Sequence, residues 1–193
     1  MLTVLHCNYA KVLTFVAQLI KMTEVYLMLG SNLGDRKFYL DAALEKINAE
    51  VGKIVRMSGD YQTEPWGTSD TRPYLNKAIT INTELSALDL LNKLLSIEQN
   101  LGRSRSHVPN EPRTIDIDIL FYGNESIHEP SLLIPHPRLH LRRFVLEPLN
   151  EISPDLIHPF LNQTIAELLK ECKDTLRVKL WVPFSKMNTD YAL

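Results

Sequence analysis

Residues 112–120 of the chain read PRTIDIDIL, an alternation of apolar and acidic side chains. Alternation with a period of two predicts a β-strand, which we place from Thr114 to Tyr122. The apolar side chains on one face are Ile115, Ile117, Ile119 and Phe121, and the acidic side chains on the other face are Asp116 and Asp118. The apolar face is expected to pack against helices, and the acidic face is expected to form a polar surface.

The segments around this strand predict two helices and three further strands. Strands are expected at 25–29, 54–61 and 74–82, where turn residues bound short apolar or alternating runs. Helices are expected where apolar residues recur at helical spacing, first at Leu40, Leu44, Ile47 and Val51 and then at Ala87, Leu91, Leu94 and Leu95. Along the chain these elements follow the order strand, helix, strand, strand, helix, strand. That order predicts an α+β fold, a ferredoxin-like βαββαβ sandwich with both helices on one sheet face.

The sequence as a whole predicts one domain with a flanking segment at each end. Prolines at positions 130, 135, 137, 148, 154 and 159 predict an irregular C-terminal extension with short helices, such as 164–172. We predict a domain at 22–173, an N-terminal extension at 1–21 and a C-terminal tail at 174–193. The apolar stretch at 12–17 lacks the basic start and the cleavage site of a signal peptide. Because the candidate site residues all lie after Tyr61, a chain beginning at Met22 is expected to fold and to be active.

The composition excludes several classes of protein. Of 193 residues, 45% are hydrophobic, which is enough to bury one sizeable core. The balance of 21 Lys plus Arg against 23 Asp plus Glu argues against a nucleic-acid-binding surface. Two cysteines make no disulfide framework, and no apolar run reaches the roughly 18 residues that span a membrane. We expect a cytoplasmic protein that binds neither nucleic acid nor membrane.

The two aspartates of the 114–122 strand predict a magnesium site. Carboxylates two residues apart on one strand face repel each other unless a cation lies between them, and Mg²⁺ readily binds such a pair. The alternative is a solvated face whose aspartates pair with arginines. Nearby, six arginines and no lysine occur between positions 103 and 143: Arg103, Arg105, Arg113, Arg138, Arg142 and Arg143. Guanidinium groups match phosphate oxygens well, so the combination indicates a polyphosphate site.

Three other polar residues extend this site. Glu98 lies on the apolar stripe of the second helix, either as an edge residue that reaches water or as a hydrogen-bond partner of a ligand, and the pattern leaves both open. Tyr74 and Asn76 share the strand face opposite Leu75, which is the aspartate face if helices cover only one side. An aromatic ring beside an amide suits a flat heterocycle, which the ring stacks on and the amide recognises.

Several other functions lack their motifs. The turn at 30–35 has neither the spacing nor the Lys-Ser/Thr ending of a phosphate-binding loop, and we interpret it as structural. No zinc pattern or serine-hydrolase motif is present. A small-molecule sensor of ferredoxin-like fold is an alternative, but a sensor has no use for paired carboxylates beside clustered arginines. A different Asp-x-Asp enzyme, such as a sugar transferase, would not require Tyr74 and Asn76 on the aspartate face.

Together these residues resemble the 6-hydroxymethyl-7,8-dihydropterin pyrophosphokinase family of folate biosynthesis. The resemblance runs from about Val25 to about Leu168. The matching motifs are LGSNLGD at 29–35, YQTEPWG at 61–67, YLN at 74–76, IE at 97–98, GRSR at 102–105, PRTIDIDIL at 112–120, PHPR at 135–138 and RRFVLEPL at 142–149. The PRxxDxD segment is fairly specific, and the ordered set is far more so.

The resemblance implies a monomeric enzyme that transfers diphosphate from ATP to the hydroxymethyl group of the pterin and releases AMP. It implies that Asp116 and Asp118 bind two Mg²⁺ ions, and that Arg103 and Arg113 stabilise charge during transfer. The implied ATP-binding residues are Leu91, Glu98, Arg105, Ile119, His136 and Arg142. The implied pterin-binding residues are Thr63, Trp66, Tyr74, Asn76 and Phe144, with Tyr74 and Phe144 on either side of the ring.

Two positions depart from the family pattern. Glu64 stands where many members have proline, and Asn110-Glu111 precede Pro112 where a small residue is usual. Both positions lie in predicted loops, so they affect loop shape. The connection from Arg103 to Arg113 is almost free of apolar residues, and we expect it to close over the phosphates when ligands bind.

Overall fold

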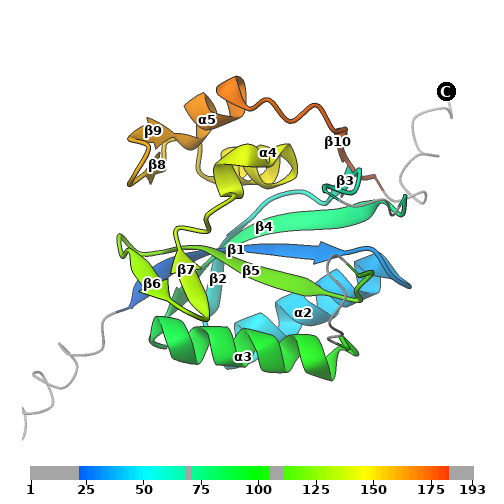
Figure 1. Cartoon of the computed structure of the whole chain (residues 1–193). Helices are drawn as coiled ribbons and strands as arrows, with labels where there is room; N and C mark the ends of the chain where they lie inside the picture. The colour runs from blue at the N-terminus through cyan, green and yellow to red at the C-terminus, as the bar shows by residue number, and fades with distance from the viewer. Residues whose placement is uncertain (1–21, 68–70, 105–110, 183–193) are drawn as a thin grey trace, which may run out of the picture.

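A central antiparallel sheet separates two layers of helices in the computed structural model, which describes residues 22–67, 71–104 and 111–182 (Figure 1). The larger elements are β1 (Thr23–Ser31), α2 (Arg36–Glu50), β2 (Lys53–Met57), β3 (Tyr61–Thr63), β4 (Tyr74–Thr83), α3 (Ala87–Asn100), β5 (Asp116–Tyr122), α4 (Arg143–Ile152) and α5 (Ile165–Glu171). Shorter elements are β6 (Ile127–Glu129), β7 (Leu132–Ile134), the 3-10 turn η1 (Leu139–Leu141), β8 (Ile157–His158), β9 (Gln163–Thr164) and β10 (Val178–Leu180). The predicted α+β class and the order of the first elements are confirmed.

The sheet places β1 and β4 at its centre. Hydrogen-bonded neighbours follow the order β10-β3-β4-β1-β5, and β2 pairs with a second part of β4. In the register of β1, Gly30 lies opposite Asn76 of β4 on one side and opposite Asp116 of β5 on the other. Two side chains that are far apart in the sequence therefore lie on either side of one glycine.

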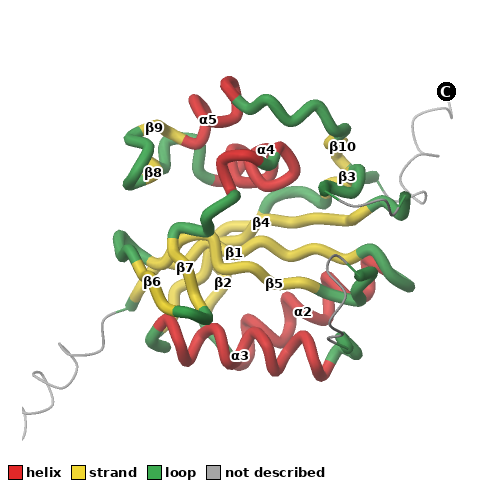
Figure 2. Tube along the Cα trace, viewed as in Figure 1, coloured by secondary structure: helices red, strands yellow, loops and turns green. Residues whose placement is uncertain are grey.

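The helices α2 and α3 cover one face of this sheet, as predicted (Figure 2). Each helix begins at a side chain that accepts a backbone hydrogen bond, Asp35 from the N–H of Phe38 and Ser86 from the N–H of Asp89. The buried stripe of α3 consists of Ala87, Leu90, Leu94, Ile97 and Glu98. The predicted stripe was slightly rotated, because its Leu91 and Leu95 are only half-buried.

The C-terminal extension is more regular than its prolines predicted. The α5 helix confirms the short helix expected near 164–172, and a capping box formed by Thr164 and Glu167 starts it. The α4 helix was not predicted, because Pro148 lies inside it and removes one helical hydrogen bond. Burial of Val145, Leu146 and Leu149 against the sheet offsets that loss. The second sheet face is thus partly covered by helices.

The β5 strand contains a bulge that changes which face Phe121 occupies. In the pairing with β1, Tyr26 lies opposite Phe121, but the next residue of β1 lies opposite Ile119. Leu120 is the extra residue, and both Leu120 and Phe121 belong to the apolar cluster beneath α4. The prediction that Phe121 faces α2 and α3 is therefore wrong.

The predicted strand at 54–61 is also wrong in its extent, because the chain leaves the β4 ladder between β2 and β3. The Ser58 hydroxyl accepts the backbone N–H of Ala78 at 3.0 Å, in place of a backbone carbonyl. The next N–H, that of Gly59, donates to the Glu151 carboxylate of α4 at 3.0 Å. These side-chain acceptors bend the chain and separate the two strands.

Two further observations concern the ends of the chain. Within the predicted tail at 174–193, β10 pairs with β3 in the main sheet. Residues 1–21 lie outside the described part of the chain, so the predicted N-terminal extension and the activity of a chain beginning at Met22 stay predictions. Among the described residues, none of the helices has the length and apolar character required to cross a membrane.

Replacing Leu146 with Ala tests whether α4 belongs to the core. The side chain is fully buried, so the substitution is expected to lower the free energy of unfolding by roughly 2–5 kcal/mol. Urea denaturation measures this loss. Leu133→Ala is the control, because Leu133 is 47% exposed and its truncation should cost less than about 1 kcal/mol. A similar small loss for both variants would contradict a core role for α4.

Candidate active site

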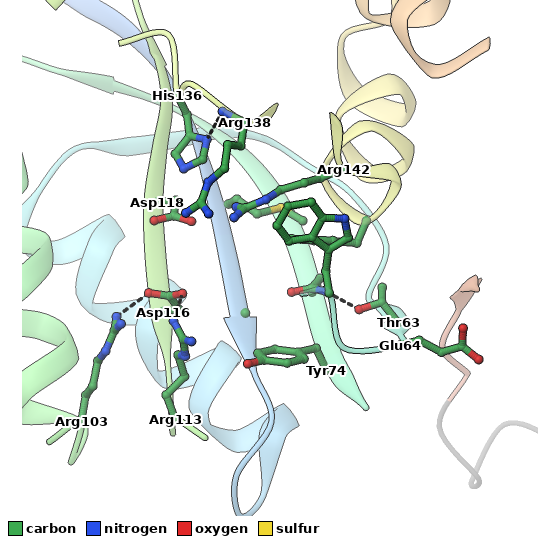
Figure 3. Close-up of a pocket in the computed structure, with 15 residues that line it drawn as sticks. Thr63, Glu64, Tyr74, Arg103, Arg113, Asp116, Asp118, His136, Arg138 and Arg142 are labelled. Carbon is green, nitrogen blue, oxygen red and sulfur yellow. Dashed lines mark hydrogen bonds and ion pairs between the residues drawn. The ribbon is translucent and has the colours of Figure 1, made fainter. Parts of the chain in front are cut away.

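A cavity of about 280 Å³ lies on the sheet face opposite α2 and α3. Its lining includes eleven predicted site residues: Thr63, Trp66, Tyr74, Asn76, Arg103, Arg113, Asp116, Asp118, His136, Arg142 and Phe144. Four further residues complete the lining: Met28, Gly30, Glu64 and Arg138. Most of the predicted site therefore converges on one cavity, although its residues come from widely separated segments (Figure 3).

Asp116 and Asp118 project into this cavity from β5 (Figure 3). Asp116 accepts hydrogen bonds from Arg103 and, at 2.6 Å, from Nη1 of Arg113. Burial, together with the neighbouring charge of Asp116, raises the pKa of Asp118 to about 7. A cation bound beside Asp118 would favour the ionised form of this carboxyl group. The pair therefore provides the carboxylate oxygens that Mg²⁺ prefers, at a point where Arg142 and Arg103 only partly offset the effects that raise the pKa of Asp118.

A cation at this pair would need ligands from outside the protein. Among residues 22–67, 71–104 and 111–182, no group of three or more His, Cys, Asp or Glu side chains is arranged to hold a metal ion. Two carboxylates with remaining positions left to water and phosphate oxygens match the way Mg²⁺ binds in nucleotide sites. The donor chemistry of Asp116 and Asp118 thus fits magnesium.

Glu98 is buried, which answers one question that the sequence left open. Its side chain is almost fully inaccessible, so it does not reach water from the edge of α3. The carboxylate accepts the backbone N–H of Ile117 at 2.7 Å and also pairs with Arg103. Glu98 lies outside the cavity lining, and it orients Arg103 toward Asp116 while anchoring β5 to α3.

Asn32 positions Arg113, a role that the sequence analysis missed. The Asn32 side-chain oxygen accepts the Arg113 N–H at 2.8 Å, and the Asn32 N–H donates to the Arg113 carbonyl at 3.2 Å. Burial lowers the pKa of Arg113, but the charges of Asp116, Tyr74 and Asp118 and the hydrogen bond to Asp116 together outweigh it, so the net pKa is raised. The turn at 30–35 is therefore structural, as predicted, but it also positions a site residue. Its only sequence signal was an Asn at a strand-to-helix turn.

The opposite side of the cavity carries two more arginines and two aromatic rings. The Arg142 guanidinium lies 4.7 Å from the Trp66 ring and 5.5 Å from the Phe144 ring, and Arg138 lies 6.0 Å from Trp66. Burial lowers the pKa of Arg142, and Arg138 adds to this effect by repulsion. Two mutually repelling arginines in one cavity favour an anionic ligand.

His136 lies beside these arginines as a neutral side chain. Burial, together with the charges of Arg142 and Arg138, lowers its pKa to about 4. Its backbone N–H donates to the Leu120 carbonyl at 3.0 Å, and its Nδ1 accepts the Arg138 N–H at 3.3 Å. At neutral pH the uncharged imidazole therefore adds no repulsion to the arginine pair.

The cavity floor has room for Asn76 because residue 30 is glycine. A Cβ atom at Gly30 would lie 2.7 Å from the Asn76 side-chain oxygen. The Asn76 amide nitrogen donates to the Thr63 hydroxyl at 2.7 Å, and both side chains are buried. This hydrogen bond fixes the orientation of the Asn76 amide group. A side chain that recognises a ligand by hydrogen bonding needs such a fixed orientation.

Four predicted site residues, all assigned to ATP, lie outside the cavity lining or outside the described chain, and Glu98 is one of them. Leu91 and Ile119 belong to the apolar layer between the sheet and the helices, and neither lines the cavity. Arg105 lies outside the described residues, as do all of 105–110 in the connection that was expected to close over phosphates. The assignment of these four to ATP stays a prediction, as do the roles assigned to the residues that line the cavity.

An acidic pair, four arginines and two aromatic walls in one cavity are features of an enzyme that handles a polyphosphate and a flat ring. The model of the 7,8-dihydro-6-hydroxymethylpterin-pyrophosphokinase (HPPK) family matches residues 26–154. The chain belongs to this family.

Similar proteins agree with this membership. The 2-amino-4-hydroxy-6-hydroxymethyldihydropteridine pyrophosphokinase of Methylorubrum extorquens is 46% identical over 137 residues, which cover 70% of this chain and 86% of that protein. The enzyme of the same name from Haemophilus influenzae is 43% identical over 160 residues, which cover 82% of this chain and 99% of that protein. A folic acid synthesis protein of Pneumocystis carinii is 41% identical over 165 residues, but the chain spans only 22% of its length.

The fold also matches a solved structure. Plasmodium falciparum HPPK-DHPS superposes with a TM-score of 0.66 over 78% of this chain, at 19% sequence identity. This chain spans 44% of the length of that protein. At this identity the similarity establishes the fold, an antiparallel sheet with helices on both sides.

Replacing Gly30 with Ala tests the packing of the cavity floor. The added methyl group should displace Asn76 from Thr63 and weaken pterin binding by about 1–3 kcal/mol, the usual cost of overpacking. Calorimetry with 6-hydroxymethyl-7,8-dihydropterin measures the loss. In an Asn76→Ala background the same substitution should add little, because the contact is already gone. Unchanged pterin affinity in the single variant would contradict this account of the floor.

Proposed function

We propose that this cavity is where the chain transfers diphosphate from ATP to 6-hydroxymethyl-7,8-dihydropterin and releases AMP. The chain is an HPPK-family pyrophosphokinase of folate biosynthesis, and the observation that carries the location is the meeting of Asp116, Asp118 and four arginines beside Trp66 and Phe144. The proposal divides the cavity into a phosphate half and a pterin half.

In the phosphate half, Asp116 and Asp118 would hold two Mg²⁺ ions. Bound there, magnesium would neutralise the charge of the phosphoryl oxygens during transfer. Arg103 and Arg113 lie next to the same carboxylate, so a polyphosphate can take over hydrogen bonds that they now make with Asp116. Arg142 and Arg138 supply further donors on the opposite side, with neutral His136 beside them.

In the pterin half, Tyr74 and Phe144 would enclose the ring, and Asn76 would recognise its edge. The hydrogen bond from Asn76 to Thr63 supports this role, because it fixes the orientation of the Asn76 amide and leaves the amide oxygen as the acceptor for the ring. Trp66 lines the same half and packs on Arg142, so the aromatic wall and the phosphate-binding arginines are in contact.

The reaction needs no nucleophilic side chain in this proposal. The hydroxymethyl oxygen bonds to the β-phosphorus, the bond from that phosphorus to the oxygen of AMP breaks, and the hydroxyl proton is released. Holding the two substrates in line and stabilising charge supply the rate enhancement. The family resemblance implies that the chain acts as a monomer. The sensor alternative gives no role to the paired carboxylates.

The direct test is an assay with ATP, Mg²⁺ and 6-hydroxymethyl-7,8-dihydropterin in which AMP is measured. Asp116→Ala and Asp118→Ala are each expected to lower kcat/KM by about 100-fold or more, because the metal loses a ligand. Asp155→Ala, which removes an exposed carboxylate, is the control and should keep normal activity. Near-normal turnover of either site variant at low magnesium would show that the aspartates hold no essential metal.

Arg113 is expected to contribute more to turnover than to ATP binding. It is already held by Asn32 and Asp116, so its forked donors are oriented before the substrate arrives. Arg113→Ala should lower kcat by about 10- to 100-fold, while the Kd for a non-hydrolysable ATP analogue rises less than about threefold. Arg113→Lys should recover only part of the rate, because it keeps the charge and loses the fork. Equal losses in kcat and nucleotide affinity would assign Arg113 to binding alone.

A further inference from the structure

Residues 172–180, here called the C-terminal segment, connect two walls of the cavity. The segment lies beyond residues 26–154, which the family model matches. It leaves the end of α5, passes the start of α4 and ends as β10 beside β3 (Figure 1). The start of α4 carries Arg142 and Phe144, and the chain after β3 carries Glu64 and Trp66, so the segment reaches both sides of the pterin half.

The first connection is at the N-terminus of α4. The Asp174 carboxylate accepts the Arg143 N–H at 3.0 Å, which is one of the helix N–H groups without an intrahelical partner. The Arg143 side chain returns the contact, since its Nε donates to the Asp174 carbonyl at 2.9 Å. The other Asp174 carboxylate oxygen accepts the Leu176 N–H at 3.0 Å and orders the segment itself. Arg143, which lies between Arg142 and Phe144, is thus attached to the segment by backbone and side chain.

The second connection is at the end of β3. Val178 pairs with Thr63, and one step further the Glu64 N–H donates to the Arg177 carbonyl at 3.2 Å. The Arg177 N–H donates to the Glu64 carboxylate at 3.0 Å, so a side chain supplies the acceptor for this step of the ladder. Pro65 follows Glu64, and a proline lacks the N–H needed to extend the pairing. The Glu64 carboxylate therefore attaches the chain to the segment two residues before Trp66.

We propose that the C-terminal segment sets the spacing between Phe144 and the Thr63–Trp66 wall, and that Asp174 and Glu64 are positioning residues for the pterin. This inference rests on the proposed function, because it concerns the pterin half of the same cavity. A separate contact joins Glu151 of α4 to Tyr61 at 2.8 Å, but it lies near the other end of the helix. Asp174 and Glu64, in contrast, make their contacts next to Phe144 and Trp66, which line the cavity.

Single substitutions at the two connections test the proposal in the full-length chain. Asp174→Ala and Glu64→Ala should each raise the KM for 6-hydroxymethyl-7,8-dihydropterin roughly three- to tenfold, the loss expected for one charge-assisted hydrogen bond. The KM for ATP should change less than about twofold. Glu64→Gln retains an acceptor oxygen and should recover most of the pterin affinity, whereas Asp174→Asn retains one of two acceptor oxygens and should recover part of it. The double alanine variant should lose less than the product of the single effects, because one segment carries both contacts.

The matched control is Lys173→Ala, which removes an exposed side chain from the same segment and should change neither KM. An unchanged pterin KM for Asp174→Ala would overturn the proposal, and so would equal losses of ATP and pterin affinity. An effect of Glu64→Ala without one of Asp174→Ala would mean that Glu64 contacts the substrate directly, which also overturns it. If Asp174→Ala fails to fold, Glu64→Ala and the smaller rise in pterin KM expected of Asp174→Asn, which loses one of two acceptor oxygens, decide between the same outcomes.

A binding measurement separates this inference from the proposed reaction. Calorimetry with the pterin, Mg²⁺ and a non-hydrolysable ATP analogue reports pterin affinity without turnover. A wild-type chain that releases no AMP would refute the reaction, while a pterin Kd that rises in the alanine variants would still support the positioning role. A pterin Kd that is the same in the wild type and both alanine variants would refute the positioning role even in an active enzyme.

Discussion

The carboxylate of Asp116 is the contact on which the arrangement of the cavity depends. It binds Arg103, which follows α3, and Arg113, which precedes β5, so the two ends of the connection at 104–112 meet at one side chain. Glu98 forms an ion pair with Arg103, and the Asn32 side chain accepts the backbone N–H of Arg113. Without Asp116, two partly buried guanidinium groups would lose a common partner, and charges removed from water depend on such partners.

The electrostatics of the cavity indicate what it binds. Asp118 has a raised pKa because of its burial and the neighbouring Asp116, and Arg142 has a lowered pKa because of its burial and the neighbouring Arg138. A carboxylate and an arginine that are both shifted toward their neutral forms indicate that each lacks sufficient opposite charge nearby. A divalent cation would supply that charge to Asp118, and a polyphosphate would supply it to the arginines. Both groups of shifts therefore support the same ligand, a metal-bound nucleotide.

Local sequence patterns predicted the main strands and helices, because each of these elements is determined by residues that are close together in the sequence. The alternation in PRTIDIDIL placed Asp116 and Asp118 on one face, and helical spacing located α2 and α3. The resemblance to a family added roles that no spacing could supply, such as those of His136 and Phe144. Those two residues reach the cavity through a proline-containing segment whose path has no periodicity.

The features that were missed depend on contacts between distant segments. The β5 bulge moves Phe121 to the other face, and the α4 helix forms although it contains Pro148, because burial against the sheet outweighs local preference. Gly30 and Asn32 looked like parts of a turn, and their roles emerge only when Asn76 and Arg113 lie beside them. In each case the residue type is compatible with the local pattern, and only the tertiary neighbour determines its function.

The pairing of β3 with β10 gives the cavity wall a stability that β3 alone would lack. A three-residue strand forms few hydrogen bonds, and one at the sheet edge would leave half of its backbone groups without a strand partner. β4 satisfies one side of β3, and β10 satisfies the other. Local unfolding free energy falls with the number of such contacts, so the segment leading to Trp66 would open more readily without β10. A cavity wall made from a three-residue strand thus depends on residues that follow α5.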